Sequence, residues 1–341
     1  MKIRLGTFNL FQFVEPPYSW YTKKEKFNAL QWVEKTTWIK HQIRLMDCDV
    51  IGFQEVFSRK ALKKLVQELG FKYFKVVDVA KLSKRDRLKY VTTTVAIASK
   101  YPIANVQGVE GYLPSMEKYH FGKNDKEQFH FSRIPIKAMI TLPNKRELLV
   151  YVCHLKSNRN NEFEYVFNEN HDLAHKKKLV CKTLTDKHSA SLKQRLCEAS
   201  SLFYDIVAYR KTPTVLLCDL NDKEFSLTID ALTNSKYHDE QSAENYVLQD
   251  ASYHYIQEVY NPHPEAKAPQ REATSYFLGK GNVLDYVFIS NDLTSKVTNY
   301  TVFNAHLKEH KDGSLLTSDH AQVVCELTLT DTAHTPKEET S

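Results

Sequence analysis

Residues Thr214–Asn221 read TVLLCDLN, a short apolar run that ends in two polar residues. The run Val215–Cys218 is typical of a buried strand. Asp219 and Asn221 follow its C-terminal end two positions apart, so both side chains can point the same way at a sheet edge. A carboxylate beside an amide donor suits the joint binding of a water and a phosphate oxygen. A turn in which both side chains bond their own backbone is the structural alternative.

The same design returns at the end or near the start of five other predicted strands. Such polar residues are Asn9 in TFNL, Glu55 in FQEV, His154 in HLKS, Asp285 in LDYVF, and Asp319 with His320 in TSDHA. Singly, each has a structural interpretation: Glu55 can cap the following helix, His154 can be a hydrogen-bonded histidine, and Asp319 can form a local turn. Asp285 enters a buried apolar strand and needs a partner there. Repeated at six places, the pattern predicts one shared site.

Composition describes an ordinary globular chain. It has 341 residues, 42% hydrophobic and 26% charged, and is long enough to bury a large core. The formal charge of +6 favours an anionic partner, with solvated surface lysines as the alternative. No run approaches the ~18 apolar residues that a membrane span needs.

The six cysteines show no zinc-site spacing. Cys153, Cys218 and Cys325 lie within apolar runs and are expected to be buried free thiols of a reducing compartment. Since no signal peptide is visible, the cytoplasm is the default location. A secreted mature form whose leader has been removed is the alternative.

Hydrophobic periodicity predicts an alternation of elements that is not doubly wound, because several strands follow one another with no helix between them. Two sheets packed face to face, with helices outside, fit this order within one domain over residues 1–330. Expected strands cover 2–10, 49–55, 71–79, 92–99, 134–142, 148–154, 214–221, 283–289, 296–303 and 322–329. Expected helices cover 34–46, a segment between Ser58 as cap and Gly70, 189–209 and 227–232.

Four segments are expected to lie outside these elements. Residues 11–33 form an aromatic, proline-broken loop, either lining a cleft or simply packed, and residues 111–131 form a long polar loop. Residues 158–187 form an insertion loop over one rim of the molecule. Residues 331–341 form a disordered polar tail.

The ordered set TFNL, FQEV, HLKS, CDLND, LDYVF and SDH resembles the endonuclease/exonuclease/phosphatase superfamily over about residues 3–329. The set is specific, although no single motif is. The resemblance implies an α/β four-layer sandwich, with two mixed β-sheets packed face to face and flanked by helices. HLKS and the expected helix containing Gln194, Arg195 and Glu198 are most similar to bacterial extracellular-nuclease-type members.

The resemblance implies a metal end of the site. Glu55 would bind a divalent cation beside Asn9, and Asp319 would support the metal or a second metal position. Hard oxygen ligands suit Mg²⁺ or Mn²⁺. Phe11 stands where some members carry a further carboxylate, which leaves a two-carboxylate site at the first strand unsupported.

It also implies catalytic roles. Asp219 would orient and deprotonate the attacking water, and Asn221 would hold that geometry or a phosphate oxygen. His320 would bond the scissile phosphate, with Asp285 fixing its tautomer. His154 would bond the phosphate on the leaving-group side. Metal and histidines together would neutralise charge during in-line displacement at phosphorus.

Two basic residues are candidates for substrate phosphate binding. Arg133 in FSRIP is similar to the arginine of the FSREP stretch in pancreatic-type deoxyribonucleases of the superfamily. A salt bridge at the rim is its structural alternative. Lys156, with Ser157, can add phosphate contacts, and a surface role is equally consistent with the sequence.

The leading hypothesis is therefore a metal-dependent phosphoesterase, in first place a nuclease acting on DNA or RNA. Basic segments 81–89 and 175–178 suit a nucleic-acid partner, and no protein partner can be inferred. The alternative enzyme is a sphingomyelinase-like or inositol-phosphate-phosphatase-like activity, whose membrane-facing loop could only be residues 11–21. A binding module that has lost activity would need broken motifs, and the core motifs are intact. The sequence leaves open DNA or RNA, endo or exo cleavage, and one or two metals.

Overall fold

A computed structural model describes residues 1–22, 26–119, 128–158, 165–185, 189–238, 246–255, 271–277, 279–308 and 314–329. The expected tail at 331–341 lies outside these ranges. Among the helices in these ranges, none combines the length and the apolar character needed to cross a bilayer.

Two six-stranded mixed sheets form the centre of the molecule. In the first, β1 pairs in parallel with β3 and antiparallel with β16, and in the second β10 pairs in parallel with β9 and antiparallel with β14. The first sheet has the order β15 (Val297–Phe303), β16 (Gln322–Thr328), β1 (Lys2–Phe13), β3 (Val50–Val56), β6 (Thr94–Ser99), β4 (Tyr73–Lys75). The second has the order β11 (Gln249–Asp250), β14 (Asp285–Ile289), β10 (Thr214–Asp219), β9 (Glu147–His154), β8 (Ile136–Thr141), β7 (Ile103–Gly108).

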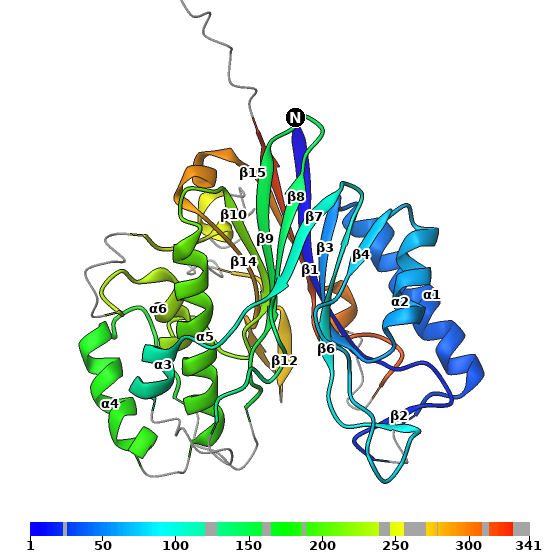
Figure 1. The fold of residues 1–341 in the computed structure, drawn as a ribbon, viewed down its shortest axis with the longest axis horizontal. Helices are drawn as coiled ribbons and strands as arrows, with labels where there is room; N and C mark the ends of the chain where they lie inside the picture. Colours follow the sequence, from blue (N-terminus) through cyan, green and yellow to red (C-terminus); the bar gives the residue numbers. More distant parts are fainter. Residues whose placement is uncertain are drawn as a thin grey trace, which may run out of the picture.

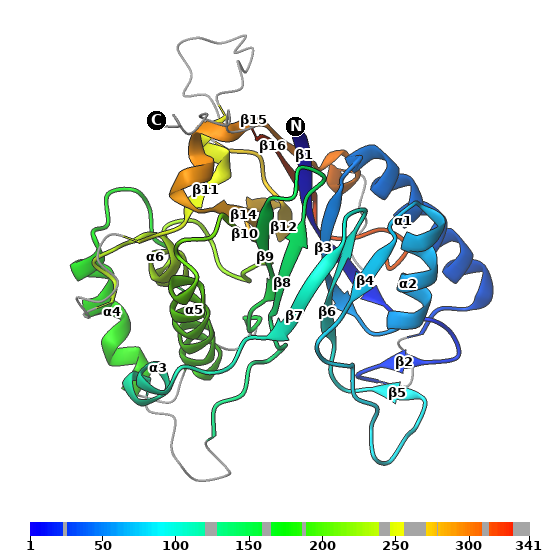
Figure 2. The same cartoon turned by 45° about the horizontal axis from the view of Figure 1, so that its top comes forward.

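Helices cover the outer face of each sheet (Figures 1 and 2). On the first sheet lie α1 (Ala29–Met46) and α2 (Arg59–Glu68). On the second lie α5 (Ala190–Ala208) and α6 (Leu227–Thr233), and α3 (Leu113–Lys118) and α4 (Leu173–Thr185) pack against these two helices. The predicted four-layer α/β sandwich is thereby confirmed. The remaining elements are the pairs β2 (Ser19–Trp20) with β5 (Lys89–Tyr90) and β12 (Ser275–Phe277) with β13 (Lys280–Asn282), and the 3₁₀ helices η2 (Ala251–His254), η3 (Asn291–Lys296) and η4 (Ala305–Lys308).

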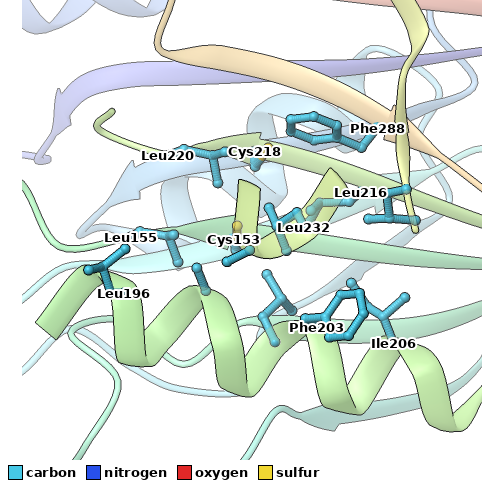
Figure 3. Packing of buried hydrophobic residues seen from close by; sticks show 14 of the residues in the cluster. Cys153, Leu155, Leu196, Phe203, Ile206, Leu216, Cys218, Leu220, Leu232 and Phe288 are labelled. Atoms are coloured by element: carbon cyan, nitrogen blue, oxygen red, sulfur yellow. The ribbon is translucent and has the colours of Figure 1, made fainter. Parts of the chain in front are cut away.

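The period-two alternation of β10 assigns its residues to two different cores. Val215 and Leu217 pack in the layer between the sheets. The intervening Leu216 and Cys218 pack against α5, where they face Phe203 and Ile206 (Figure 3). Apolar residues on both sides of one strand explain why the sequence reads as a nearly continuous hydrophobic run.

A glycine in β3 allows the two sheets to approach each other closely. A Cβ built on Gly52 would lie 2.9 Å from Val152 Cγ1 and 3.0 Å from Leu217 Cβ. Both neighbours belong to the second sheet, so a side chain at this position would push the sheets apart. The close approach at Gly52 sets the distance between the two sheets. The polar residues predicted to form the site lie at one end of the layer between these sheets.

Several predicted boundaries were wrong near the N-terminus. Within the expected loop 11–33, β1 continues to Phe13, and α1 already begins at Ala29 behind a capping box made by Asn28 and Gln31. The Ser58 side chain does not cap α2. Instead its Oγ accepts the Glu15 backbone N–H at 2.8 Å, because the chain after β1 runs beside this helix end.

Other predictions were wrong where short elements lack a clear period. The strand expected over 71–79 is limited to Tyr73–Lys75. The loop expected over 111–131 contains α3, and β7 had no counterpart in the prediction. The expected insertion loop 158–187 contains the 13-residue helix α4, within which Lys176 reaches Asp230 of α6 at 2.7 Å.

Candidate active site

The polar residues at the strand ends continue the layer between the two sheets. Along β10 the positions facing the other sheet are Val215, Leu217 and then Asp219, and along β14 the same parity joins Asp285 to Val287. Four residues placed in this way are almost fully buried, with exposures of 1% for Asn9, 2% for His154 and 0% for Asp219 and Asp285. The pattern that fills the core with aliphatic side chains thus delivers four polar groups to one end of it.

A hydrogen bond between the sheets joins Asn9 and Asp219. Asn9 Nδ2 donates to Asp219 Oδ2 at 2.9 Å. The other carboxylate oxygen, Oδ1, accepts the Asn221 backbone N–H at 2.8 Å, and Asn221 has a left-handed backbone with φ of +50°. The local turn that was the alternative for this motif is therefore present, and it fixes the Asp219 carboxylate rather than competing with the site. The Asn221 amide donates to the Leu155 carbonyl at 3.0 Å.

His320 is held against Asp285. Its Nδ1 lies 2.8 Å from Asp285 Oδ2, and its backbone N–H donates to Ser318 Oγ at 3.0 Å. Thr274 Oγ1 in turn accepts the Asp285 backbone N–H at 3.1 Å. With Nδ1 engaged by the carboxylate, Nε2 is the ring nitrogen left for a substrate.

Electrostatic effects shift the pKa values of Asp219 and His320. Burial and the Asp285 charge raise the pKa of Asp219 to about 6, although His320 opposes the shift. Burial would lower the pKa of His320, but Asp285 and Asp219 outweigh it and hold that pKa well above its usual range. Near neutral pH the site therefore has a protonated imidazole beside an ionised carboxylate that can accept a proton.

His154 contributes a neutral imidazole. Its Nε2 lies 3.4 Å from Asp219 Oδ2. Burial and the positive charges of Arg133, His320 and Lys156 hold the pKa of His154 well below its usual range. Its Nδ1 is buried without a hydrogen-bond partner among the described residues. A buried ring nitrogen in a polar site needs a hydrogen-bond partner, which a bound water or a ligand would provide.

The Glu55 end of the site has the features of a cation site. Glu55 has a left-handed backbone with φ of +58°, and its Oε2 accepts the Gln12 backbone N–H at 2.8 Å. Burial and the nearby Asp319 carboxylate raise the pKa of Glu55. Asp319 Oδ1 is buried without a hydrogen-bond partner within the described ranges, and it lies 4.0 Å from His320 Nε2. Two carboxylates close enough to influence each other electrostatically, one of them with an open oxygen, fit a divalent cation with hard oxygen ligands, and the Asn9 side-chain oxygen is a further candidate ligand.

A second group of possible metal ligands overlaps the catalytic candidates. Ligand atoms of Asp219, Asp285 and His320 all lie within 4.8 Å of one another. In the structure, however, His320 and Asp285 are already hydrogen-bonded to each other. The open oxygen of Asp319 makes the Glu55 end the better cation site.

The two phosphate-binding candidates lie on loops that one buried carboxylate holds. Glu198 of α5 is 0% exposed; its Oε1 accepts the Ser132 N–H at 2.6 Å and its Oε2 accepts the Lys156 N–H at 2.7 Å. Arg133 Nη1 donates to the Leu155 carbonyl at 2.9 Å, a bond into the site loop and not the rim salt bridge that was the structural alternative for this residue. Glu198 was quoted in the sequence only as part of a motif, and nothing there indicated that it would hold both loops.

Arg195 completes this support from the same helix. Its Nε donates to Asp222 Oδ2 at 3.0 Å, and its Nη1 donates to the Lys156 carbonyl at 3.1 Å. Asp222 follows directly after Asn221, so one guanidinium ties the two site loops together. Lys35 of α1, which is 0% exposed, is a further buried charge beside the site that sequence reasoning missed.

Comparison with known proteins identifies a family for this chain. A model described as the Endonuclease/Exonuclease/phosphatase family matches residues 6–320. No curated protein sequence matches the chain.

Solved structures share the fold at low sequence identity. Truncated TDP2 of Caenorhabditis elegans is 12% identical with a TM-score of 0.52, covering 96% of this chain and 98% of that one. The human Nocturnin catalytic domain with bound sulfate is 14% identical with a TM-score of 0.53, covering 96% and 95%. An AP endonuclease from Archaeoglobus fulgidus is 13% identical with a TM-score of 0.53, covering 96% and 100%.

Proposed function

Because the chain belongs to the endonuclease/exonuclease/phosphatase family, we propose that it hydrolyses phosphodiester bonds of nucleic acid with the help of a divalent cation. Members of this family are phosphoester hydrolases and are generally dependent on divalent metal ions. The observation that carries the proposal is the Asp219 carboxylate held by Asn9 within 3.8 Å of the His320 ring, which Asp285 keeps charged. A base beside a fixed positive donor suits attack of water on a phosphate.

Asp219 would act as the general base. It takes a proton from the attacking water while the water oxygen forms the new bond to phosphorus in line with the departing ester oxygen. The bonds from Asn9 Nδ2 and the Asn221 N–H hold the carboxylate in one orientation, so less conformational entropy is lost when water and substrate bind.

The two histidines would donate hydrogen bonds to oxygens of the reacting phosphate. His320, positively charged and anchored through Nδ1, presents Nε2 to a non-bridging oxygen on which charge develops. Neutral His154, with its unpaired Nδ1, would hydrogen-bond on the leaving-group side. Arg133 and Lys156 would bind flanking phosphates.

Glu55, Asp319 and Asn9 are the residues that would hold Mg²⁺ or Mn²⁺. A cation bound there supplies positive charge that offsets the charge developing on the phosphate. Glu55 belongs to β3, Asn9 to β1, and Asp319 to the segment before β16. The fold therefore brings the three residues together only when the first sheet is complete.

Charge on the surface supports a nucleic-acid substrate. Within segment 81–89, four basic side chains are exposed: Lys81, Lys84, Arg85 and Arg87. Such a cluster suits a phosphate backbone. The second expected basic segment, 175–178, is less available, because Lys176 pairs with Asp230 at 2.7 Å and Lys177 donates to the Tyr237 carbonyl at 2.9 Å.

A phospholipid head group is the alternative substrate. Residues 11–21, the segment expected to face a membrane in that case, are mostly packed, with Val14 and Trp20 at 0% exposure and Tyr21 at 48%. Apolar side chains are also exposed beside the basic cluster, where Leu88 and Val91 are exposed by 50% and 44%.

One assay separates these substrates. Purified protein with Mg²⁺ is incubated with circular plasmid, linear duplex, single-stranded DNA and RNA, and in parallel with sphingomyelin vesicles and inositol phosphates. We expect metal-dependent cleavage of a polymer. Release of phosphocholine or phosphate from the small substrates, with every polymer intact, would contradict the nuclease assignment and favour the head-group alternative.

We also propose that the protein works in a reducing compartment such as the cytoplasm. All six cysteines are free thiols, and five of them are buried. Buried unpaired cysteines are typical of proteins that fold without oxidation.

A further inference from the structure

Lys35 is a lysine of α1 that the fold buries completely, with 0% exposure. It lies on the inner face of the helix one turn before Ile39. Lysine is rarely buried without a reason, because removing an ammonium group from water is costly. Its environment therefore needs an explanation.

The Lys35 ammonium donates to two backbone carbonyls from opposite ends of the chain. Its Nζ lies 2.9 Å from the Phe11 oxygen and 3.1 Å from the Thr317 oxygen. It also lies over the Phe11 ring at 5.5 Å and the Phe27 ring at 6.0 Å from the centroids. These contacts link the end of β1 to the segment before β16.

The first of these carbonyls belongs to an irregular turn within the end of β1, where the register with β3 shifts between Asn9 and Phe13, and this turn holds side chains of the metal end. Phe11 and Gln12 both have left-handed backbones, with φ of +50° and +62°, which residues other than glycine seldom adopt. The turn aims the Phe11 N–H at Asn9 Oδ1, at 2.9 Å, and the Gln12 N–H at Glu55 Oε2, at 2.8 Å. Two adjacent strained residues at a site require support from their surroundings.

The second carbonyl begins the segment that carries Asp319 and His320. Ser318, next to Thr317, donates through its hydroxyl to the Asn9 carbonyl at 2.7 Å, so this segment already lies against β1. Burial lowers the pKa of Lys35 to about 7, while the charges of Asp319 and Glu55 oppose that shift. The ammonium thus lies within electrostatic reach of both metal-end carboxylates.

We propose that Lys35 is a positioning residue for the cation site: by joining the Phe11–Gln12 turn to the Thr317–His320 segment, it holds Asn9 and Glu55 in place against Asp319 before the cation binds. The inference rests on the proposed function for the identity of the site. It does not depend on which phosphodiester is cleaved.

Two possible roles for Lys35 predict opposite changes in cation affinity when the residue is replaced. If its charge only repelled the cation, removing the charge would tighten cation binding, because like charges at short range oppose each other. If it holds the ligands in place, removing it would weaken binding, because the cation would then have to order the turn and the segment itself. Metal affinity therefore distinguishes the two.

The test compares Lys35→Met and Lys35→Arg with Lys40→Met. Lys40 is on the same helix and pairs with Glu68 at the surface, which makes it a matched control. Mn²⁺ binding is measured by paramagnetic resonance. Amide hydrogen exchange of Phe11 and Gln12 is measured in chelator, which gives a readout that needs neither metal nor turnover.

Lys35→Met should bind Mn²⁺ about tenfold more weakly and exchange the Phe11 and Gln12 amides at least about tenfold faster than wild type. Lys35→Arg should recover part of both losses, and Lys40→Met should match wild type. Unchanged or tighter Mn²⁺ binding by Lys35→Met, or no recovery in Lys35→Arg, would overturn the proposal.

If Lys35→Met does not fold, Lys35→Gln provides the same comparison, since it loses the charge and keeps one amide donor group. Weaker Mn²⁺ binding supports the proposal, and equal or tighter binding overturns it. Wild-type protein that binds Mn²⁺ but cleaves no phosphodiester would refute the proposed function and leave the role of Lys35 standing. Active wild type with unaltered metal binding in the variant would do the reverse.

Discussion

His320 Nδ1 lies 2.8 Å from Asp285 Oδ2, and both side chains are buried at the end of the layer between the two sheets. This contact joins the first sheet to the second, because His320 precedes β16 and Asp285 opens β14. It keeps a positive charge beside the Asp219 carboxylate at neutral pH. Loss of the contact should therefore change the charge of His320 and the activity more than it changes the fold.

Replacing Asp285 by Asn should lower the pKa of His320, because the main source of its elevation is removed. We expect the alkaline limb of the pH–rate profile to move to lower pH, and kcat/KM to fall by about 10²-fold. Proton NMR titration of the His320 ring measures the pKa directly. Asp47→Asn, at an exposed helix end, is the control. An unchanged His320 titration would show that Asp285 does not set its charge.

Activity should decline in acid through protonation of Asp219. Its folded-state pKa is raised to about 6, and the base works only when deprotonated. Below that pH, kcat/KM should fall about tenfold per unit, whereas above it the limb should level off. A bound cation stabilises the carboxylate, so the limb can lie below 6 in saturating Mg²⁺. A kcat/KM that increases as the pH is lowered from 6 to 5 would contradict the role of Asp219.

Glu198→Gln should weaken substrate binding more than turnover. The variant places an amide group where two backbone N–H donors point, and an unsatisfied buried donor costs about 1–3 kcal/mol. We expect a higher KM with little change in kcat, because the loops of Arg133 and Lys156 lose their anchor. Steady-state kinetics and thermal melts test this. Glu147→Gln, at the exposed start of β9, should behave as wild type.

Removal of divalent metal should abolish activity, and Mg²⁺ or Mn²⁺ should restore it. A cation that binds the folded state alone also stabilises it, by about 2.7 kcal/mol at a hundredfold excess over Kd. Saturating Mg²⁺ should therefore raise the melting temperature of wild type, and raise that of Glu55→Gln by much less. A full rate in excess EDTA would show that the Glu55 end has no metal role.

Much of the site could be predicted because strand periodicity fixes which side chains face the other sheet. The parity of Val215, Leu217 and Asp219 is visible in the sequence, and the polar residues repeated at strand ends predict one shared site. The face-to-face packing of two sheets also followed from strands that succeed one another without helices. The catalytic roles of these residues stay predictions until variants are assayed.

The supporting residues could not be predicted, since each breaks a local rule. Lys35 lies on a buried helix face where lysine is normally excluded, and Phe11 and Gln12 adopt backbones that usually require glycine. β7 alternates poorly, with Ile103 buried and most of the strand exposed or half-buried, so its pattern is weak. Such exceptions are maintained by contacts between segments far apart in sequence, and those contacts appear only in the folded molecule.

The central claim is that Asp219 is the base of a phosphodiesterase, and the most direct test is the kcat/KM of Asp219→Asn on a DNA or RNA oligonucleotide at saturating Mg²⁺. The amide is nearly isosteric but accepts no proton, so we expect a loss of about 10²–10⁴-fold with an intact fold by circular dichroism. Activity within about tenfold of wild type would contradict the account.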